Sequence, residues 1–173
     1  MIPIPQAFER GSKFSDDAKY RYMLYRRWNE ALPMVFFIGL NPSIADDKQE
    51  DPTQLRMRHF AQGWGYGGYF VGNLFALVST DPRGLDEVHD PVGLPDNDQW
   101  LASMQGQSAR TIAAWGCQGR KNDSIVHRRA AKVAYNMRQS GDLYCLATTT
   151  DGCPRHPLYL KGNLQPVLYT KGH

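Results

Sequence analysis

The chain has 173 residues, the length of one compact domain, and its 42% hydrophobic and 21% charged residues exclude global disorder. No window is apolar enough to span a bilayer and the N-terminus lacks a signal-peptide pattern, so we expect a cytoplasmic protein that does not bind membranes. The three cysteines show no CxxC spacing, which predicts reduced thiols rather than disulfides or a thiolate metal site. The net charge of +3 is too small to predict nucleic-acid binding by itself.

The basic residues are concentrated in one segment, 110–138, in which Asp123 is the only acidic residue. Acidic residues gather instead in segments 46–51 and 81–98. The basic segment is a candidate anion-binding surface, although a charged run of this kind also forms an ordinary solvated face. The charge distribution leaves both interpretations open, and nothing in the sequence indicates the oligomeric state.

The first half of the chain predicts two helices and two strands. Helical spacing of large side chains predicts a helix over 16–28, capped by Ser15 or Asp16. The apolar run 34–39 ends in a glycine and predicts a strand that is buried on both faces. The other predicted elements of this half are a helix over 53–61 and an aromatic, β-branched strand over 69–77.

The second half of the chain also predicts two helices and two strands, which alternate along the sequence. It predicts a helix capped by Asp96 or Asn97 and running through Met104, a strand over 110–116, an amphipathic helix from Asp123 or Ser124 to about Gln139, and a strand over 143–147. Four short apolar strands alternating with helices predict an α/β fold with three layers around a central, mainly parallel four-stranded sheet. We expect a single domain over 1–173, with its core within about 16–162 and loosely ordered termini.

Ligands of open α/β sheets bind beyond the carboxyl ends of the strands, so we expect the functional residues there. These positions hold amides, bases and one imidazole but few acids, which is typical of a site for a neutral, hydrogen-bonding ligand with a phosphate attached. The residues that follow the four predicted strands are 39–43, Asn73, 115–120 and 152–156.

Two loops could carry chemistry, and each also has a simpler interpretation. Residues 116–120 follow a strand and precede a helix, so their backbone N–H groups and Arg120 could bind a phosphate, or they form an ordinary turn. Residues 46–51 lack the spacing of a calcium loop and predict a solvated loop, in which Asp46 or Asp51 could activate water as a general base. The five histidines show no HxH or HExxH spacing, so we expect neither a metal nor a cofactor.

Two single residues stand out. His156 follows the last predicted strand and precedes a proline, so it is either a turn residue or a functional imidazole. Asn73 lies in an aromatic strand, where a buried amide must be hydrogen-bonded. Its side chain therefore either holds a neighbouring loop or binds a ligand.

Six motifs resemble a family of bacterial and phage proteins known only as a domain of unknown function: GLNPSIAD (39–46), DPT (51–53), WGYGG (64–68), NLFAL (73–77), AWG (114–116) and PRHPLYL (154–160). The resemblance covers the chain from about residue 20 to residue 159. The order of these motifs is also similar to that of the uracil-DNA glycosylase superfamily. In that superfamily a GINPG-type motif follows the first strand, a base-reading Asn ends a later strand, and the last motif begins His-Pro-Ser. Here Ser43 replaces the final glycine of the first motif and Leu158 replaces the serine of the last.

This second resemblance implies a uracil-DNA-glycosylase-like fold and an enzyme that hydrolyses the N-glycosidic bond of a base, such as a modified pyrimidine, in DNA. It implies that Asn41 positions water, that Asn73 reads the base and that His156 stabilises the departing base anion, while Phe75 or Tyr66 stacks on the extruded base. Asp46 is the third expected catalytic residue. The other residues expected to bind substrate are Gly39, Leu40, Pro42, Ser43, Gly116, Arg120 and Arg155.

Two alternatives stay open. The same pocket could belong to an enzyme that processes a free nucleotide or nucleoside, because the net charge of +3 is small for a protein that binds double-stranded DNA. The protein could also be a non-catalytic nucleic-acid-binding module, in which Arg128, Arg129 and Lys132 of the basic helix contact phosphates. In each case the expected partner is DNA or a nucleotide.

Overall fold

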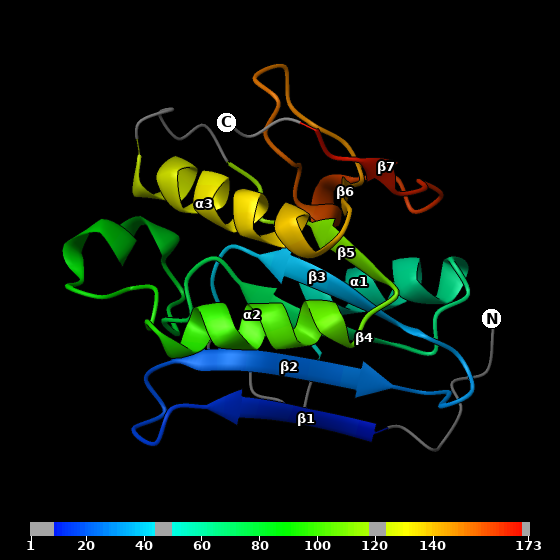
Figure 1. Ribbon diagram of the computed structural model, residues 1–173, viewed down its shortest axis with the longest axis horizontal. Coiled ribbons are helices and arrows are strands. Elements are labelled where there is room, and N and C mark those ends of the chain that lie inside the picture. Colours follow the sequence, from blue (N-terminus) through cyan, green and yellow to red (C-terminus); the bar gives the residue numbers. More distant parts are fainter. Residues whose placement is uncertain (1–8, 44–49, 118–123, 171–173) are drawn as a thin grey trace.

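The computed structural model describes residues 9–43, 50–117 and 124–170, which form one mixed sheet with helices on both faces (Figure 1). The seven strands follow the order β1-β2-β4-β3-β5-β6-β7. They are β1 (Glu9–Phe14), β2 (Arg21–Arg27), β3 (Met34–Gly39), β4 (Gly68–Asn73), β5 (Arg110–Ala113), β6 (Leu143–Cys145) and β7 (Val167–Leu168). The described helices are α1 (Pro52–Gly63), α2 (Asp96–Gly106) and α3 (Ile125–Ser140), with two 3-10 turns, η1 (Pro82–Glu87) and η2 (Pro157–Tyr159).

The centre of the sheet consists of the four strands that the sequence predicts. β4, β3, β5 and β6 are neighbours and pair in parallel, which confirms the α/β class. The sheet has seven strands rather than four because β1 and β2 extend one edge and β7 extends the other, all through antiparallel pairing. β1 and β7 lie outside the span 16–162 that was expected to contain the core.

β3 is buried on both faces, as its apolar run predicts. Phe36 and Ile38 pack into the core under α2 and α3, whereas Val35 and Phe37 pack on the opposite face against α1. The alternation of side chains along a strand produces this division, since successive residues point to opposite faces. Figure 1 shows the same arrangement, with α2 and α3 in front of the sheet and α1 behind it.

The helix predicted over 16–28 is wrong, because this segment contains strand β2. Burial in β2 has a period of two: Leu24 and Arg26 are buried, while Met23, Tyr25 and Arg27 are half-buried. β2 pairs with β1 on one side and with β4 on the other. The pairing with β4 therefore overrides the apolar spacing that favoured a helix.

The ends of the other helices and strands differ slightly from the predicted ones. β4, β5 and β6 end earlier than predicted, although Leu74 and Ala114 still donate backbone hydrogen bonds to Gly39 and Ile38. α1 begins after Asp51 and α3 after Ser124, and both residues cap their helices with a side-chain oxygen. α2 begins after Pro95 without a side-chain cap, so the predicted capping by Asp96 or Asn97 is wrong. Glycines and Trp64 join α1 to β4.

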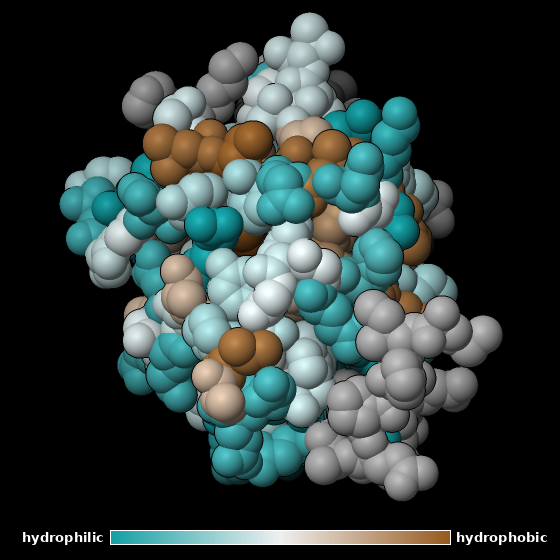
Figure 2. Space-filling view, turned by 90° about the vertical axis from the view of Figure 1, so that its right-hand side faces the viewer, coloured by the Kyte–Doolittle hydropathy of each residue, from teal (hydrophilic) through white to brown (hydrophobic). Residues whose placement is uncertain are grey.

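The surface is mostly hydrophilic on the side shown in Figure 2, where exposed apolar side chains gather in the upper part of the view. β7 is the outermost strand at one edge of the sheet, and its side chains Val167 and Leu168 are about half exposed, at 53% and 54%. Among the described helices, none is both long and apolar enough to cross a bilayer.

Candidate functional site

A pocket of about 160 Å³ opens at the carboxyl ends of the central parallel strands. We call it the strand-end pocket. Several elements contribute to it: β2, the segment after β3, the first turn of α1, the end of β4, the segment after β5 and the loop before η2. Its lining residues are Arg21, Gly39, Leu40, Asn41, Ser43, Asp51, Thr53, Gln54, Met57, Val71, Asn73, Trp115 and His156. The structure thus brings Asn41, Asn73 and His156 to one pocket.

Asn73 is the last residue of β4 and lies opposite Gly39 in the parallel ladder. A Cβ atom on residue 39 would lie 2.7 Å from Asn73 Oδ1, so the glycine makes room for the amide. Asn73 is buried, with 5% exposure, and no described residue hydrogen-bonds to its side chain. A buried amide without protein partners has both a donor and an acceptor free for a ligand.

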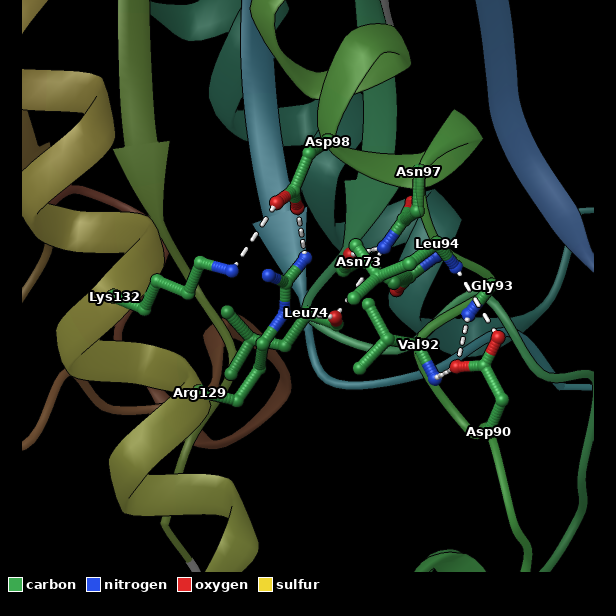
Figure 3. A network of polar contacts seen from close by, with 10 residues as sticks. All are labelled: Asn73, Leu74, Asp90, Val92, Gly93, Leu94, Asn97, Asp98, Arg129 and Lys132. Carbon is green, nitrogen blue, oxygen red and sulfur yellow. Dashed lines mark hydrogen bonds and ion pairs between the residues drawn. The ribbon is translucent and has the colours of Figure 1, made fainter.

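The main chain at Asn73 is held from α2 and α3 (Figure 3). Asn97 Nδ2 donates to the carbonyl oxygens of Asn73 and Leu74, at 3.1 and 3.3 Å, and Arg129 Nε donates to Leu74 at 2.8 Å. Arg129 also forms an ion pair with Asp98. We call Asn97, Asp98 and Arg129 the α2–α3 junction. It fixes the backbone from which the Asn73 side chain projects.

His156 lies immediately before η2 and is half-buried. The backbone N–H of Leu158 donates to His156 Nδ1 at 3.3 Å, so the neutral ring carries its proton on Nε2. Burial lowers the pKa of His156, and the nearby Asp51 carboxylate opposes that shift more weakly. The ring is therefore neutral at pH 7 and offers an N–H donor at Nε2. Gly116, with φ of 65°, packs against it, because a Cβ there would lie 3.1 Å from His156 Cβ.

Asn41 and Asp51 both line the strand-end pocket, and hydrogen bonds hold each side chain in place. Asn41 Nδ2 donates to the carbonyl oxygens of Ser79 and Pro42, at 2.9 and 3.2 Å, which leaves its oxygen as the group for a ligand or water. Asp51 Oδ1 accepts from the backbone N–H of Gln54 at 2.8 Å, and Oδ2 accepts from Ser43 Oγ at 3.1 Å. These hydrogen bonds orient the carboxylate, and each oxygen keeps a lone pair for a further donor.

Sequence reasoning missed several lining residues. Arg21 was assigned to a helix that does not form, and its position opposite the end of β4 depends on the antiparallel pairing of β2. Gln54 adjoins the DPT motif, and nothing in its spacing distinguishes it from a core residue. Trp115 lies within the strand-end segment 115–120, where functional residues were expected, but it was not assigned a role. An Asp followed by a Pro is a typical start of a helix. Asp51 and Pro52 were therefore the sequence signal for where α1 begins, and this start lies at the pocket.

Other predicted residues do not line the pocket. Phe75 is fully buried in the core under α2 and α3, and Tyr66 is buried on the α1 face, so neither is placed to stack on a base. Arg155 is exposed and Pro42 is buried beside the pocket without lining it. Asp46 and Arg120 lie outside the described residues, so their expected roles stay predictions.

One of the three basic residues of α3 that were expected to contact phosphates does not lie at the surface. Arg129, expected to contact phosphates, is 6% exposed and pairs with Asp98, while Lys132 Nζ lies 3.8 Å from the same carboxylate. The expected role of Arg129 in the binding module is therefore wrong, because its guanidinium is buried in the α2–α3 junction.

The expectation of reduced thiols is wrong for two of the three cysteines. Cys117 and Cys153 form a disulfide with Cα atoms 6.2 Å apart. Both lie in segments after parallel strands, and such segments meet at one edge of the sheet although 36 residues separate them. The bond ties the loop that carries His156 to the end of β5. Cys145 is free, and burial raises the pKa of its thiol to about 11.

No group of three or more His, Cys, Asp or Glu side chains that could hold a metal occurs among residues 9–43, 50–117 and 124–170. The polar groups of the residues that line the strand-end pocket are amides, one imidazole, one carboxylate, two hydroxyls, an indole and an arginine. Such groups can hold a neutral ring by hydrogen bonds and stabilise a developing negative charge.

Comparison with known proteins relates the chain to one family. Its family model matches residues 21–158 and is described as "Protein of unknown function (DUF1643)". The match includes all the lining residues of the strand-end pocket. No curated protein and no solved structure matches the chain.

Proposed function

We propose that this chain, which belongs to the family described as "Protein of unknown function (DUF1643)", is an N-glycosylase that hydrolyses the bond between a base and its sugar in DNA. The observation that carries the proposal is the convergence of the Asn73 amide and the neutral His156 ring on one small pocket. The proposal includes the uracil-DNA-glycosylase-like fold that the order of the motifs implies.

The size of the pocket supports a single base as the bound group. About 160 Å³ is well below the roughly 300–1,000 Å³ of pockets that enclose drug-sized ligands, so it suits one ring rather than a whole nucleotide. A base in a duplex would have to leave the stack to enter it. The free amide of Asn73 would then bind one edge of the base through its donor and its acceptor.

The chemistry follows from the groups that line the pocket. The bond between C1′ and the base nitrogen breaks with its electron pair moving to the base, where negative charge builds on a carbonyl oxygen. His156 Nε2–H donates to that oxygen, and a donor in such a position typically accelerates the reaction by ~10²–10³. A water molecule held by Asn41 Oδ1 bonds to C1′ on the sugar, and its proton passes to the Asp51 carboxylate.

Alkaline cleavage of a labelled oligonucleotide tests the proposal. The substrates carry uracil, hydroxymethyl-substituted or mismatched bases in single- and double-stranded DNA, and abasic sites are scored after heating in alkali. We expect the wild-type protein to form abasic sites and His156→Ala to slow this ~10²–10³-fold. His89→Ala is the matched control, because His89 is an exposed histidine and does not line the pocket. Absence of both cleavage and binding on every substrate would contradict the proposal.

A second candidate function is an enzyme that acts on a free nucleoside or nucleotide. It is favoured by the burial of Arg129, which removes one cation from the surface expected to contact a DNA backbone. Salt distinguishes the two functions. Affinity for DNA falls steeply as the salt concentration rises, whereas the affinity of a single nucleotide falls only slightly.

A further inference from the structure

The disulfide joins two segments that both contribute to the strand-end pocket. Cys117 follows Trp115 and Gly116 after β5, and Cys153 lies just before His156 in the loop that precedes η2. Trp115 and His156 both line the pocket. The bond therefore crosslinks the site itself rather than two parts of the scaffold far from it.

The hydrogen bonds of the loop that carries Cys153 are local. Thr149 Oγ1 accepts from the backbone N–H of Cys153 at 3.1 Å, and the backbone N–H of Thr149 donates to the carbonyl oxygen of Cys153 at 2.8 Å. The backbone N–H of Arg155 donates to the carbonyl oxygen of Ala147 at 2.9 Å, which joins the loop to the segment just after β6. These hydrogen bonds shape the loop without reaching the segment after β5. The disulfide does reach that segment, so it fixes the distance between the two.

Close packing connects the bond to the imidazole of His156. Gly116 has a φ of 65°, and a Cβ placed on it would lie 3.1 Å from His156 Cβ and 3.5 Å from His156 N. The residue next to Cys117 is thus packed against the histidine that follows Cys153. Two thiols cannot approach each other as closely as two bonded sulfur atoms. Breaking the bond therefore moves the two segments apart, and tight packing passes this movement to His156.

The fold does not require this disulfide. Disulfides replace a hydrophobic core mainly in small domains, whereas this chain of 173 residues has a core on each face of its sheet. Cys117 and Cys153 are 9% and 8% exposed, and the free thiol residue, Cys145, is 1% exposed. The bonded cysteines are thus the more accessible ones, and they lie beside a pocket. Both features are typical of a regulatory rather than a structural disulfide.

We propose that the Cys117–Cys153 disulfide is a reversible redox switch of the strand-end pocket, which holds His156 in place when oxidised and releases it when reduced. A dithiol, or two thiols of the glutathione type, supplies the two electrons. One thiolate attacks a sulfur atom of the disulfide, so that the S–S bond breaks and a mixed disulfide forms. A second thiolate of the reductant then displaces the protein sulfur. Each cysteine ends as a thiol with one proton, and the reductant leaves as a disulfide. The inference rests on the proposed function for the reaction that is switched, but the movement of the pocket does not depend on it.

Thiol counting and NMR test the switch in the folded protein without relying on catalysis. Wild-type protein is equilibrated in buffers of increasing ratio of reduced to oxidised glutathione, then quenched in acid, unfolded and alkylated, and mass spectrometry counts the labels. We expect one label per chain in oxidising buffer, on Cys145, and three in reducing buffer. The NMR signals of the His156 ring and of the Gly116 N–H should shift in step with the label count and return on reoxidation. Circular dichroism should stay unchanged throughout.

Cleavage of an oligonucleotide that carries uracil is the second measurement, at a temperature at which both forms are folded. Reduction should slow the formation of abasic sites about 10²-fold, the loss that a misplacement of about 1 Å typically causes. The double variant Cys117→Ser, Cys153→Ser should be equally slow and should not respond to glutathione. Cys145→Ala is the matched control, and it should respond as the wild-type protein does. The wild-type measurements decide the matter even where the double variant does not fold.

The outcomes separate the switch from the proposed function. If the bond is reduced only when the protein unfolds, the disulfide is structural and the inference is overturned. It is also overturned if reduction leaves the signals of His156 and Gly116 and the cleavage rate unchanged. If the signals shift as expected but the protein cleaves no DNA in either state, the proposed function fails while the switch of the pocket stands.

Discussion

The α2–α3 junction and the strand-end pocket both bury polar side chains, yet they use them differently. At the junction, Asn97 and Arg129 donate to backbone carbonyl groups of residues 73 and 74, and Arg129 pairs with Asp98 (Figure 3). At the pocket, Asn73 makes no side-chain hydrogen bond with any described residue, and Gln54 Nε2 has no partner. Asn97 Oδ1 and Arg129 Nη1 of the junction also lack a partner among the described residues, so an unpaired atom alone does not distinguish the two regions. The distinction is that the junction side chains bind main chain and stabilise the fold, whereas the amide of Asn73 lines a cavity and is available to a ligand.

The contrast between two asparagines is the simplest form of this difference. Asn97 and Asn73 are both almost completely buried, with 0% and 5% exposure. Asn97 Nδ2 donates to the carbonyl oxygens of Asn73 and Leu74, so this amide group is part of the scaffold, although its Oδ1 has no partner among the described residues. Asn73 has its backbone held and its side chain free. Burial alone therefore does not identify a structural residue, and the partners of each polar atom must be followed.

The largest expected effect is at the junction. Arg129→Met removes the buried partner of Asp98, which keeps only the longer contact with Lys132, and one of the two donors to the Leu74 carbonyl group, so we expect the free energy of unfolding to fall by about 3–5 kcal/mol. Chemical denaturation measures this change. Lys132→Met is the matched control, because exposed Lys132 lies 3.8 Å from the same carboxylate and should cost at most about 1 kcal/mol. Equal effects of the two substitutions would remove the distinction between a buried junction and a solvated helix face.

The second-largest expected effect is that of removing the disulfide, which connects the loop of His156 at the pocket to the end of β5. Replacing Cys117 and Cys153 together by Ser removes a crosslink between residues 36 apart, and we expect a loss of about 2–4 kcal/mol. A reducing agent should lower the melting temperature of the wild-type protein but not that of the double variant. Because the bond holds the loop of His156, base binding should weaken in the double variant as well. A reducing agent without effect on the wild-type protein would show that the crosslink does not stabilise it.

The two asparagines give a smaller but more specific effect. Asn97→Ala leaves two carbonyl groups short of a donor, and we expect a loss of about 1–3 kcal/mol in the free energy of unfolding. Asn73→Ala should change that free energy by less than about 1 kcal/mol but weaken base binding about 10- to 100-fold. Denaturation and NMR titration of the two variants separate these effects. The reverse pattern would mean that Asn73 is the structural residue of the pair.

The smallest effect concerns pH. Burial lowers the pKa of His156 in the folded protein, so protonation is less favourable there than in the unfolded chain. The resulting stability is fully present above pH ~6.5, the unfolded pKa of histidine, and is lost as pH falls toward the lowered pKa of the folded state. His156→Gln should therefore lose less stability than the wild-type protein between pH 7.5 and pH 5. Parallel curves for the two proteins would show that the ring is as accessible to protons as in the unfolded chain.

The sequence predicts the central strands and α1 to α3 well, because their patterns are local. The run 34–39 is apolar throughout, and Asp51 and Ser124 cap helices as their residue types indicate. The helix predicted over 16–28 is wrong for a physical reason. β2 pairs with β4, which is far away in the chain, and Arg26 is buried at a position that an amphipathic pattern treats as polar. The disulfide also depends on distant segments, so the spacing of cysteines does not show it.

The pocket could be predicted only in part. Strand ends indicate Asn41, Asn73 and His156, because parallel strands bring their carboxyl ends to one edge. Gln54 could not be distinguished from a core residue, and Trp115 was expected only as part of segment 115–120, since which side chains line the pocket depends on how α1 packs against the sheet. Phe75 was misplaced for a related reason: an aromatic residue just past a strand end can point into the core or into the pocket.

The central claim is that the strand-end pocket binds a base through the free side chain of Asn73, while Asn97 belongs to the scaffold. NMR titration of ¹⁵N-labelled protein with free uracil tests this claim most directly, with the side-chain NH₂ signals assigned through Asn73→Ala and Asn97→Ala. We predict that the Asn73 signals shift progressively to saturation while those of Asn97 change little. Shifts confined to other residues, with the Asn73 signals unchanged at saturating base, would contradict the account.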